Sequence, residues 1–335
     1  MSNWYQNEAV NSDIAVSSRI RIARNLKGIP FPSKMSLEQK KELNKKVKSA
    51  ITNSNSSFAK SLKYIEMRDI PENQRFAMVE RHIISPEFAA KGLDGAIILS
   101  SDESISIMVG EEDHIRIQVI LGGLNIGEAY DIADKIDTLL HNSLDFAFDS
   151  KLGFLTECPT NLGTGLRASV MLHLPALETS GEMESLSQSI SKIGFTVRGM
   201  YGEGTKSLAS LYQISNQITL GLSEKNALDN LKIITAQLIE KEKEIRNGYN
   251  KLKIEDLCFR ALGLLQNSRI LSSEEAMNLL SSVKLGKSMG ILDIEQSPIK
   301  LLIESQPFML MQKFGIMEAD ERDICRANMI RETLK

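Results

Sequence analysis

The first two-thirds of the chain alternates between strand-like and helix-like hydrophobic patterns. In residues 114–121, Ile115, Ile117 and Val119 alternate with polar residues, which is the two-residue period of a strand with one buried face. Similar patterns predict strands over 62–67, 96–99, 105–109, 114–121 and 195–200. Because several of these strands follow one another directly, we expect an antiparallel sheet.

Helices are predicted between and around these strands. Ser36 followed by Gln39 is a capping-box signal that opens a helix ending near Ile51, and the polar residues 52–57 read as a loop. Apolar residues at helical spacing predict two further helices over 127–144 and 182–193. Strands followed by helices without a regular βαβ alternation are typical of an α+β fold.

After about Leu222 the pattern becomes purely helical. Ser272 and Glu275 form a second capping-box signal, and the predicted helices span 223–247, 254–266, 273–283, 298–312 and 318–334. We therefore expect two domains, one over 1–248 and a small all-helical one over 249–335.

Composition excludes several classes of protein. Hydrophobic residues make up 42% and charged residues 25%, as in ordinary globular chains, and the net charge of −3 gives no bulk cationic field for nucleic acid. Any anion site must therefore be local. The three cysteines, Cys158, Cys258 and Cys325, are widely spaced, and the four histidines have no metal-binding spacing. We expect no metal cage, no membrane span, no leader segment and a cytoplasmic location.

Two arginines close to the start of the chain suggest an anion site. Arg19 and Arg21 are two residues apart, so on an extended segment their side chains point to the same side. Two guanidinium groups side by side repel unless an anion lies between them, and guanidinium suits bidentate phosphate contacts. On spacing alone, a strand whose polar face happens to hold arginines remains an alternative.

Three other segments carry candidate chemistry. Residues 110–116 gather acidic residues, one of which could hold a cationic substrate and accept its proton, although such residues often simply face water. In 157–168, Cys158 lies at a chain reversal, and Arg167 is expected to enter a short helix; a buried inert cysteine is the alternative. Residues 198–205 form a glycine-rich loop that presents one arginine and one glutamate, or a plain turn.

Together these segments resemble the phosphagen (guanidino) kinases. The runs Cys-Pro-Thr-Asn-Leu-Gly-Thr at 158–164 and Glu-Glu-Asp-His-x-Arg at 111–116 carry the likeness, which extends over about 12–224. The resemblance implies a catalytic domain built on an antiparallel sheet flanked by helices. It also implies ATP as the phosphoryl donor and Mg²⁺ as its cofactor.

The resemblance assigns roles to individual residues. It implies that phosphates are gripped by Arg19, Arg21, Arg116, Arg167 and Arg198, and that His82 contacts the nucleotide. The implied nucleotide-binding set also contains Ser17, Ser18, Ile20, Ala168, Ser169, Val170, Met171, Gly199, Met200, Tyr201, Gly202 and Glu203. Glu112 and Glu203 match the two carboxylates on the guanidinium, and Cys158 matches the reactive cysteine.

Those roles fit the chemistry of a guanidinium acceptor. A guanidinium is a poor nucleophile because its charge is delocalised and its pKa exceeds about 12. Glu112 and Glu203 at two edges of the group would hold it in line with the γ-phosphorus, and one of them would accept the proton. Cys158 would act as an electrostatic partner of the guanidinium rather than as a nucleophile.

The chain departs from the classical members in three ways. Ser17 lies almost at the start, so the usual N-terminal helical domain is missing; Gly110 replaces an asparagine; and a helical region follows the kinase-like part. This combination resembles the bacterial protein-arginine kinase branch, whose C-terminal domain carries Arg-Asp-x-x-Arg-Ala, here residues 322–327. Arg322 and Arg326 share a helix face and could bind phosphate, and Asp323 could bind the guanidinium of phosphoarginine. A solvated helix is the alternative.

The expected function is therefore ATP-dependent phosphorylation of arginine side chains in proteins. The resemblance implies that phosphorylated arginine marks proteins for Clp-type proteolysis in a stress response. It also implies a heat-shock repressor among the substrates, a zinc-binding activator protein, and a homodimer. It also implies that the helical domain favours marked proteins or couples to the kinase site. Two alternatives remain: a metabolic phosphagen kinase acting on a free guanidino compound, disfavoured by the missing N-terminal domain, and a non-catalytic phosphoarginine-binding adaptor, disfavoured by the complete set of matched residues.

Overall fold

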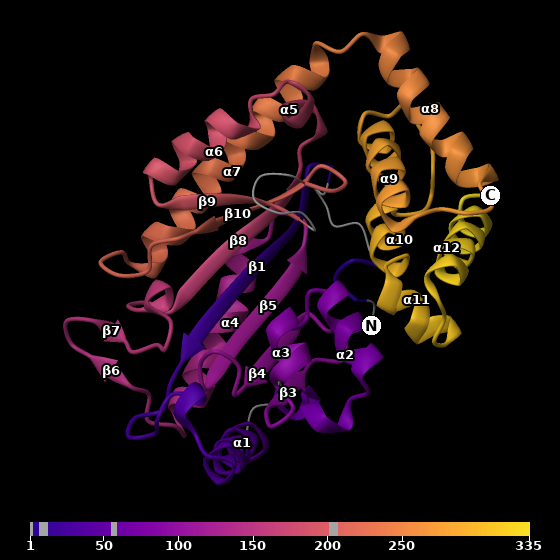
Figure 1. The fold of residues 1–335 in the computed structure, drawn as a ribbon. Helices are drawn as coiled ribbons and strands as arrows, with labels where there is room; N and C mark the ends of the chain where they lie inside the picture. The colour runs from indigo at the N-terminus through magenta and orange to yellow at the C-terminus, as the bar shows by residue number, and fades with distance from the viewer. Residues whose placement is uncertain (1–2, 7–12, 55–58, 201–206) are drawn as a thin grey trace.

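The fold is built around one eight-stranded sheet (Figure 1). The computed structural model describes residues 3–6, 13–54, 59–200 and 207–335. Neighbouring strands are all antiparallel, in the order β2-β3-β4-β5-β1-β8-β10-β9. The strands are β1 (Ala15–Arg24), β2 (Lys63–Glu66), β3 (Ala96–Leu99), β4 (Ile105–Val109), β5 (Ile115–Gly122), β8 (Leu166–His173), β9 (Phe195–Gly199) and β10 (Leu211–Asn216). A separate hairpin joins β6 (Phe148–Asp149) to β7 (Gly153–Phe154). The predicted α+β fold with an antiparallel sheet is confirmed.

Helices connect the strands and then continue alone. In the first part they are α1 (Leu37–Thr52), α2 (Glu72–Glu80), α3 (Pro86–Lys91), α4 (Ile126–His141), α5 (Pro175–Thr179), α6 (Met183–Lys192) and α7 (Glu224–Asn247). The remainder holds α8 (Lys251–Asn267), α9 (Ser273–Ser288), α10 (Pro298–Glu304), α11 (Pro307–Phe314) and α12 (Ala319–Thr333). The predicted capping box is present: Ser36 Oγ accepts the Gln39 N–H, and the Gln39 side chain accepts the Ser36 N–H.

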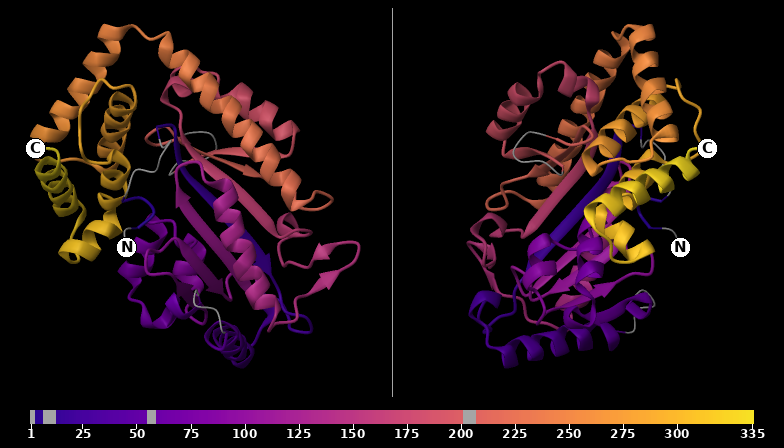
Figure 2. Two further views of the ribbon diagram at one scale, coloured as in Figure 1. Left: turned by 180° about the vertical axis from the view of Figure 1, so that it is seen from behind. Right: turned by 45° about the vertical axis from the view of Figure 1, so that its right-hand side comes forward.

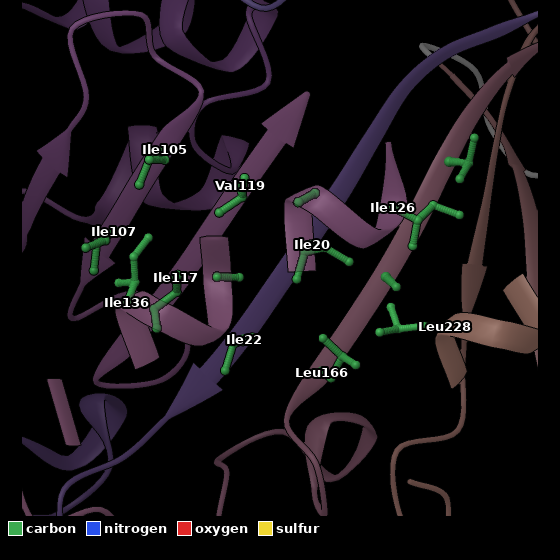
Figure 3. Close-up of a cluster of buried hydrophobic side chains, with 14 of the residues drawn as sticks. Ile20, Ile22, Ile105, Ile107, Ile117, Val119, Ile126, Ile136, Leu166 and Leu228 are labelled. Atoms are coloured by element: carbon green, nitrogen blue, oxygen red, sulfur yellow. The ribbon is translucent and has the colours of Figure 1, made fainter. Parts of the chain in front are cut away.

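One face of the sheet carries the main apolar core. Ile20 and Ile22 of β1 point to this face, together with Ile117 of β5 and Leu166 of β8 (Figure 3). Helices α4 and α7 lie across it, as the view from behind in Figure 2 shows. Burying such aliphatic side chains contributes about 1.5–3 kcal/mol each, so this face anchors the sheet.

The opposite face is covered only at its two ends. Over β3 and β4, α2 and α3 pack in an apolar cluster that includes Phe88, Ile97 and Met108. Over β8 and β10, Met171 and Leu211 share another cluster with the helices from α8 onward. Between the two coverings, the described part of the chain leaves a cavity over the middle of this face, where Arg19, Arg21 and Gln118 line it.

Two predicted elements are wrong. Arg167 does not enter a helix but lies in β8, because residues 166–173 pair along their length with β1 and β10 and alternate between the two sheet faces. The single helix predicted over 298–312 is two helices, α10 and α11. Pro307 has no backbone N–H and disfavours a helical conformation at Gln306, so the chain turns there.

Among the residues that the structure describes, there is no helix with the length and apolarity that crossing a membrane requires.

Candidate active site

The open face of the sheet gathers five arginines from four strands. Arg21 of β1 lies directly opposite Arg167 of β8, and Arg19 lies opposite Ser169. On the other side of β1, Arg21 pairs with Gln118, two residues after Arg116. In β9, Arg198 pairs with Gln213 of β10, and Gln213 Oε1 accepts a hydrogen bond from Arg19 Nη2 at 2.7 Å. Because side chains alternate along a strand, all five arginines project from this one face.

The cationic cluster is electrostatically unfavourable on its own. Burial, together with the charges of Arg116 and Arg167, lowers the pKa of Arg19 to about 10. Burial and the same neighbouring charges, together with Arg19, hold the pKa of Arg21 well below its usual value. The Nε atoms of Arg21 and Arg167 are buried without a hydrogen-bond partner among the described residues. Such an arrangement is stabilised by a bound polyanion.

A cavity of about 650 Å³ opens over this cluster. Arg19, Arg21 and Arg116 line its cationic end, and His82 also lines it. Gln118 positions His82, because its amide donates to the carbonyl oxygens of His82 and Ile83 at 2.8 and 3.0 Å. The His82 backbone has a φ of 62°, which reverses the chain after α2. Burial lowers the pKa of His82 to about 3, so its ring is neutral.

A second cavity, of about 790 Å³, holds the acidic and thiol groups. Glu111, Glu112 and Cys158 line it, and Arg116 lines both cavities together with Ser85 and Pro86. Arg116 donates to Glu111 Oε1 at 2.8 Å and to Glu112 Oε2 at 2.5 Å. A polyanion site and a carboxylate site therefore meet at a single guanidinium group.

The thiol group lies close to the arginines. Cys158 Sγ is 3.0 Å from the Thr160 hydroxyl oxygen. Burial lowers the pKa of Arg167, as do the charges of Arg198 and Arg116, whereas Cys158 and Glu112 oppose this decrease. Cys158 and Glu112, which line the second cavity, therefore interact electrostatically with Arg167 of the arginine cluster.

One buried residue that the sequence pattern did not single out joins the two loops of the second cavity. Asp113 is fully buried, and its carboxylate accepts hydrogen bonds from the Asn25 amide at 2.7 Å and the Glu157 N–H at 2.8 Å. Asn25 in turn accepts the His114 N–H. Asp113 therefore fixes the Glu112 loop relative to the Cys158 loop. In the sequence, Asp113 directly follows Glu111 and Glu112, and no local pattern distinguishes it from these two acidic residues.

The backbone gives a reason for the glycine at position 110. Gly110 has a φ of +74°, a region that glycine and asparagine tolerate better than other residues. Glycine in place of asparagine therefore keeps the turn that leads into Glu112.

The remaining candidates from the sequence fall into three groups. Those on the arginine face are Ser17, Ser169 and Met171, while Met200, just after β9, lines the first cavity and Gly199 ends β9. Those whose side chains point to the opposite face are Ser18, Ile20, Ala168 and Val170. Tyr201, Gly202 and Glu203 lie outside the described residues.

In the C-terminal helices, the two motif arginines differ in burial. Arg326 is 1% exposed, and its guanidinium donates to the carbonyl oxygens of Ser305 and Leu271 and to Asp323 Oδ1. Arg322 is half-buried, with Nη1 3.9 Å from the Met311 sulfur. Arg326 is therefore held by protein acceptors, and Arg322 is the more open of the two.

This geometry suits transfer chemistry between an anionic and a cationic reactant. The cationic cavity fits the phosphates of a nucleotide, and the acidic cavity fits a cation that must lose a proton to react. Within the described part of the chain, no group of three or more His, Cys, Asp or Glu residues could hold a metal ion.

Comparisons with known proteins give the same picture. The model of the ATP:guanido phosphotransferase C-terminal catalytic domain matches residues 42–245, and that of the protein-arginine kinase McsB C-terminal domain matches 251–335. The protein-arginine kinase of Caldanaerobacter subterraneus subsp. tengcongensis is 44% identical over 97% of this chain and 98% of its own. That of Clostridium acetobutylicum is 43% identical over the whole of both chains.

Solved structures share the fold. A lombricine kinase has a TM-score of 0.62 at 22% identity and covers 74% of this chain and 71% of its own. The duplicated taurocyamine kinase of Schistosoma mansoni, bound to transition-state-analogue components, has a TM-score of 0.63 at 26% identity, covering 77% and 39% of the two chains.

Proposed function

The chain belongs to the ATP:guanido phosphotransferase family, within its protein-arginine kinases, and from this premise we propose how its residues phosphorylate arginine side chains of proteins. The observation that carries the proposal is the meeting of the two cavities at Arg116. The phosphates of ATP lie on Arg19, Arg21, Arg116, Arg167 and Arg198, with His82 on the nucleotide. The guanidinium of the substrate enters the acidic cavity.

The chemical step follows from this placement. Glu112, together with Glu203, holds the guanidinium so that one nitrogen faces the γ-phosphorus in line with the leaving ADP oxygen. A nitrogen–phosphorus bond forms as the bond to ADP breaks, and one glutamate accepts the proton. The arginines stabilise the charge that spreads over the phosphoryl oxygens. Cys158 lies beside the substrate guanidinium as an electrostatic partner and does not act as a nucleophile.

Mg²⁺ would enter with the phosphates, and when bound it would supply further charge neutralisation. No residue of the chain is assigned to it.

We propose that residues 1–248 form the catalytic domain and that residues 249–335 form a domain that recruits phosphoarginine. In the second, Arg322 and Asp323 contact the phosphate and guanidinium of the ligand, and Arg326 holds Asp323 in place. This arrangement favours proteins that already carry the mark or couples them to the kinase site, across a homodimer if one forms.

The biological part of the proposal rests on family resemblance. The mark directs proteins to Clp-type proteolysis in a cytoplasmic stress response, a heat-shock repressor is among the substrates, and a zinc-binding protein activates the enzyme. Incubating a marked and an unmarked protein with the Clp protease would test it, since only the marked protein should be degraded.

The central test is a transfer assay with ATP and Mg²⁺. We expect an acid-labile phosphorus–nitrogen bond on an arginine-rich protein, detected by phosphorus NMR, and little transfer to free arginine. The Glu112→Gln variant should lose about 10²–10⁴-fold in rate because a general base is removed. Glu128→Gln, on the exposed side of α4, is the matched control. Transfer to free arginine alone would contradict the protein substrate.

A further inference from the structure

The cavity over the arginine cluster has a second wall that comes from the C-terminal helices. Besides Arg19 and Arg21, it is lined by Met277 of α9 and by Pro307 and Phe308 of α11. These residues follow Arg19 and Arg21 by more than 250 positions in the sequence. The cavity is therefore a composite of both regions of the chain.

The second wall is fixed to the catalytic part by α2. The rings of Phe76 and Phe308 stack with centroids 4.9 Å apart and an angle of 24°. Glu80 accepts the backbone N–H groups of Phe308 and Met309 at 3.0 and 2.8 Å, which caps the first turn of α11. Figure 1 shows α2 and α11 side by side. The Phe76–Phe308 pair thus has a defined position relative to the arginines.

The lining of the cavity combines two kinds of side chain. Guanidinium groups come from the sheet, and an apolar surface comes from the Phe76–Phe308 pair with Val79, Met277 and Leu208; Glu80 and Glu274 also line the cavity. A nucleoside triphosphate has the same polarity, with an anionic tail and a flat, largely apolar base. Contacts between a base and aromatic side chains contribute about 1–3 kcal/mol in other sites.

We propose that the C-terminal helical region forms the base-binding wall of the nucleotide site, with the adenine ring packed against the Phe76–Phe308 pair. This inference rests on the proposed function, because it requires the triphosphate to lie on the sheet arginines. It gives the C-terminal region a second task, direct contact with the nucleotide, which is separate from recruitment of phosphoarginine.

The experiment compares two ligands that share a tail but not a base. Binding of Mg·ATP and of Mg·tripolyphosphate is measured by calorimetry on the full chain and on Phe308→Ala. We expect Phe308→Ala to weaken ATP binding about tenfold and to change tripolyphosphate binding less than twofold. The matched control is Phe314→Ala, which removes a 50% exposed ring from the same helix and should change neither affinity.

A second measurement uses the unmodified chain, so its result does not depend on whether the Phe308→Ala variant folds correctly. In hydrogen exchange, ATP should slow the amides at the start of α9 and of α11 more than tripolyphosphate does. Equal protection by the two ligands would contradict the inference, as would an equal loss, or no loss, of both affinities in Phe308→Ala. If the unmodified chain binds neither ligand, the proposed function itself fails.

Discussion

Two groups of buried arginines in this molecule have opposite surroundings. On the sheet, Arg21 lies among Arg19, Arg116 and Arg167, and its Nε has no hydrogen-bond partner among the described residues. In the C-terminal helices, Arg326 is more deeply buried, but its guanidinium reaches two carbonyl oxygens and one carboxylate. Both arginines are buried, so burial does not distinguish their surroundings. The difference is that hydrogen-bond acceptors surround Arg326, whereas the Nε of Arg21 has none among the described residues.

The difference assigns different roles. A buried cation without acceptors raises the free energy of the folded protein until an anion binds, whereas a cation with acceptors holds elements together. Arg326 connects α12 to the end of α10 and to the segment before α9. On the sheet, Arg19 donates to Gln213 and Arg116 donates to Glu111 and Glu112. The Nε atoms of Arg21 and Arg167, by contrast, have no partner among the described residues, so these two guanidinium groups are available to a ligand.

The largest effect should come from Arg21→Met, which removes the charge and keeps most of the length. We expect the transfer rate to fall about 10³-fold or more, because the cation near the phosphoryl group is lost. The free energy of unfolding should stay the same or rise, because repulsion within the cluster is relieved. Enzyme assays and urea unfolding measure the two quantities. A large loss of stability would show that Arg21 is structural.

Arg326→Met should do the reverse. It leaves Asp323 and two carbonyl oxygens without their donor, so we expect the free energy of unfolding to fall by about 3 kcal/mol. Urea unfolding at neutral pH measures it. Arg322→Met is the control, because Arg322 lies on the same helix and is half-buried, with its Nη1 3.9 Å from the Met311 sulfur. If Arg326→Met unfolds like the control, the comparison between the two groups is wrong.

A pH experiment examines the contact between the two regions. Burial raises the pKa of Glu80 from 4.5 to about 7, although the Phe308 and Met309 N–H groups and the charges of Arg326 and Arg81 lower it. Between these values the folded state binds more protons than the unfolded state, so the free energy of unfolding decreases as pH rises. We expect about 2 kcal/mol for this decrease, after allowance for partial exposure.

The measurement is urea unfolding at pH 4.5 and pH 7.5. The Glu80→Gln variant cannot titrate at this position, so the decrease should be smaller in the variant than in the unmodified chain by the stated amount. Parallel pH profiles for the two proteins would contradict the raised pKa.

The smallest expected effect is the stabilisation of the folded protein by tripolyphosphate, an anion that lacks a nucleobase. Tripolyphosphate at ten times its dissociation constant should raise the free energy of unfolding by about 1.4 kcal/mol. The same ligand concentration should stabilise Arg326→Met equally and Arg21→Met much less. Thermal unfolding with and without the ligand measures the increments. Equal increments in all three proteins would place the anion elsewhere.

The sequence predicts part of this arrangement for a clear reason. The two-residue spacing of Arg19 and Arg21 is local information, and it correctly places both side chains on one face of a strand. The register that brings Arg167 opposite Arg21 joins residues 146 positions apart, which no local pattern contains. Only the family resemblance predicts that Arg167 joins Arg19 and Arg21 in one phosphate site.

Other features required long-range packing. Nothing in the local sequence distinguishes Asp113, whose role depends on Asn25 and on the Glu157 N–H from distant segments. The alternating residues of β8 are a local strand pattern, but it is the pairing with β1 and β10 that makes this segment a strand rather than a helix. Pro307, by contrast, is a local signal for the break between α10 and α11.

The position of β1 has a consequence for biosynthesis. Among the described strands of the sheet it is synthesised first, yet it occupies an inner place, and its neighbours β5 and β8 follow about 100 and 150 residues later. Both of its edges therefore stay unpaired while much of the chain is made. Such delayed, non-local pairing slows folding and exposes nascent chains to aggregation, so newly made copies of this protein should depend on chaperones more than their mature stability suggests.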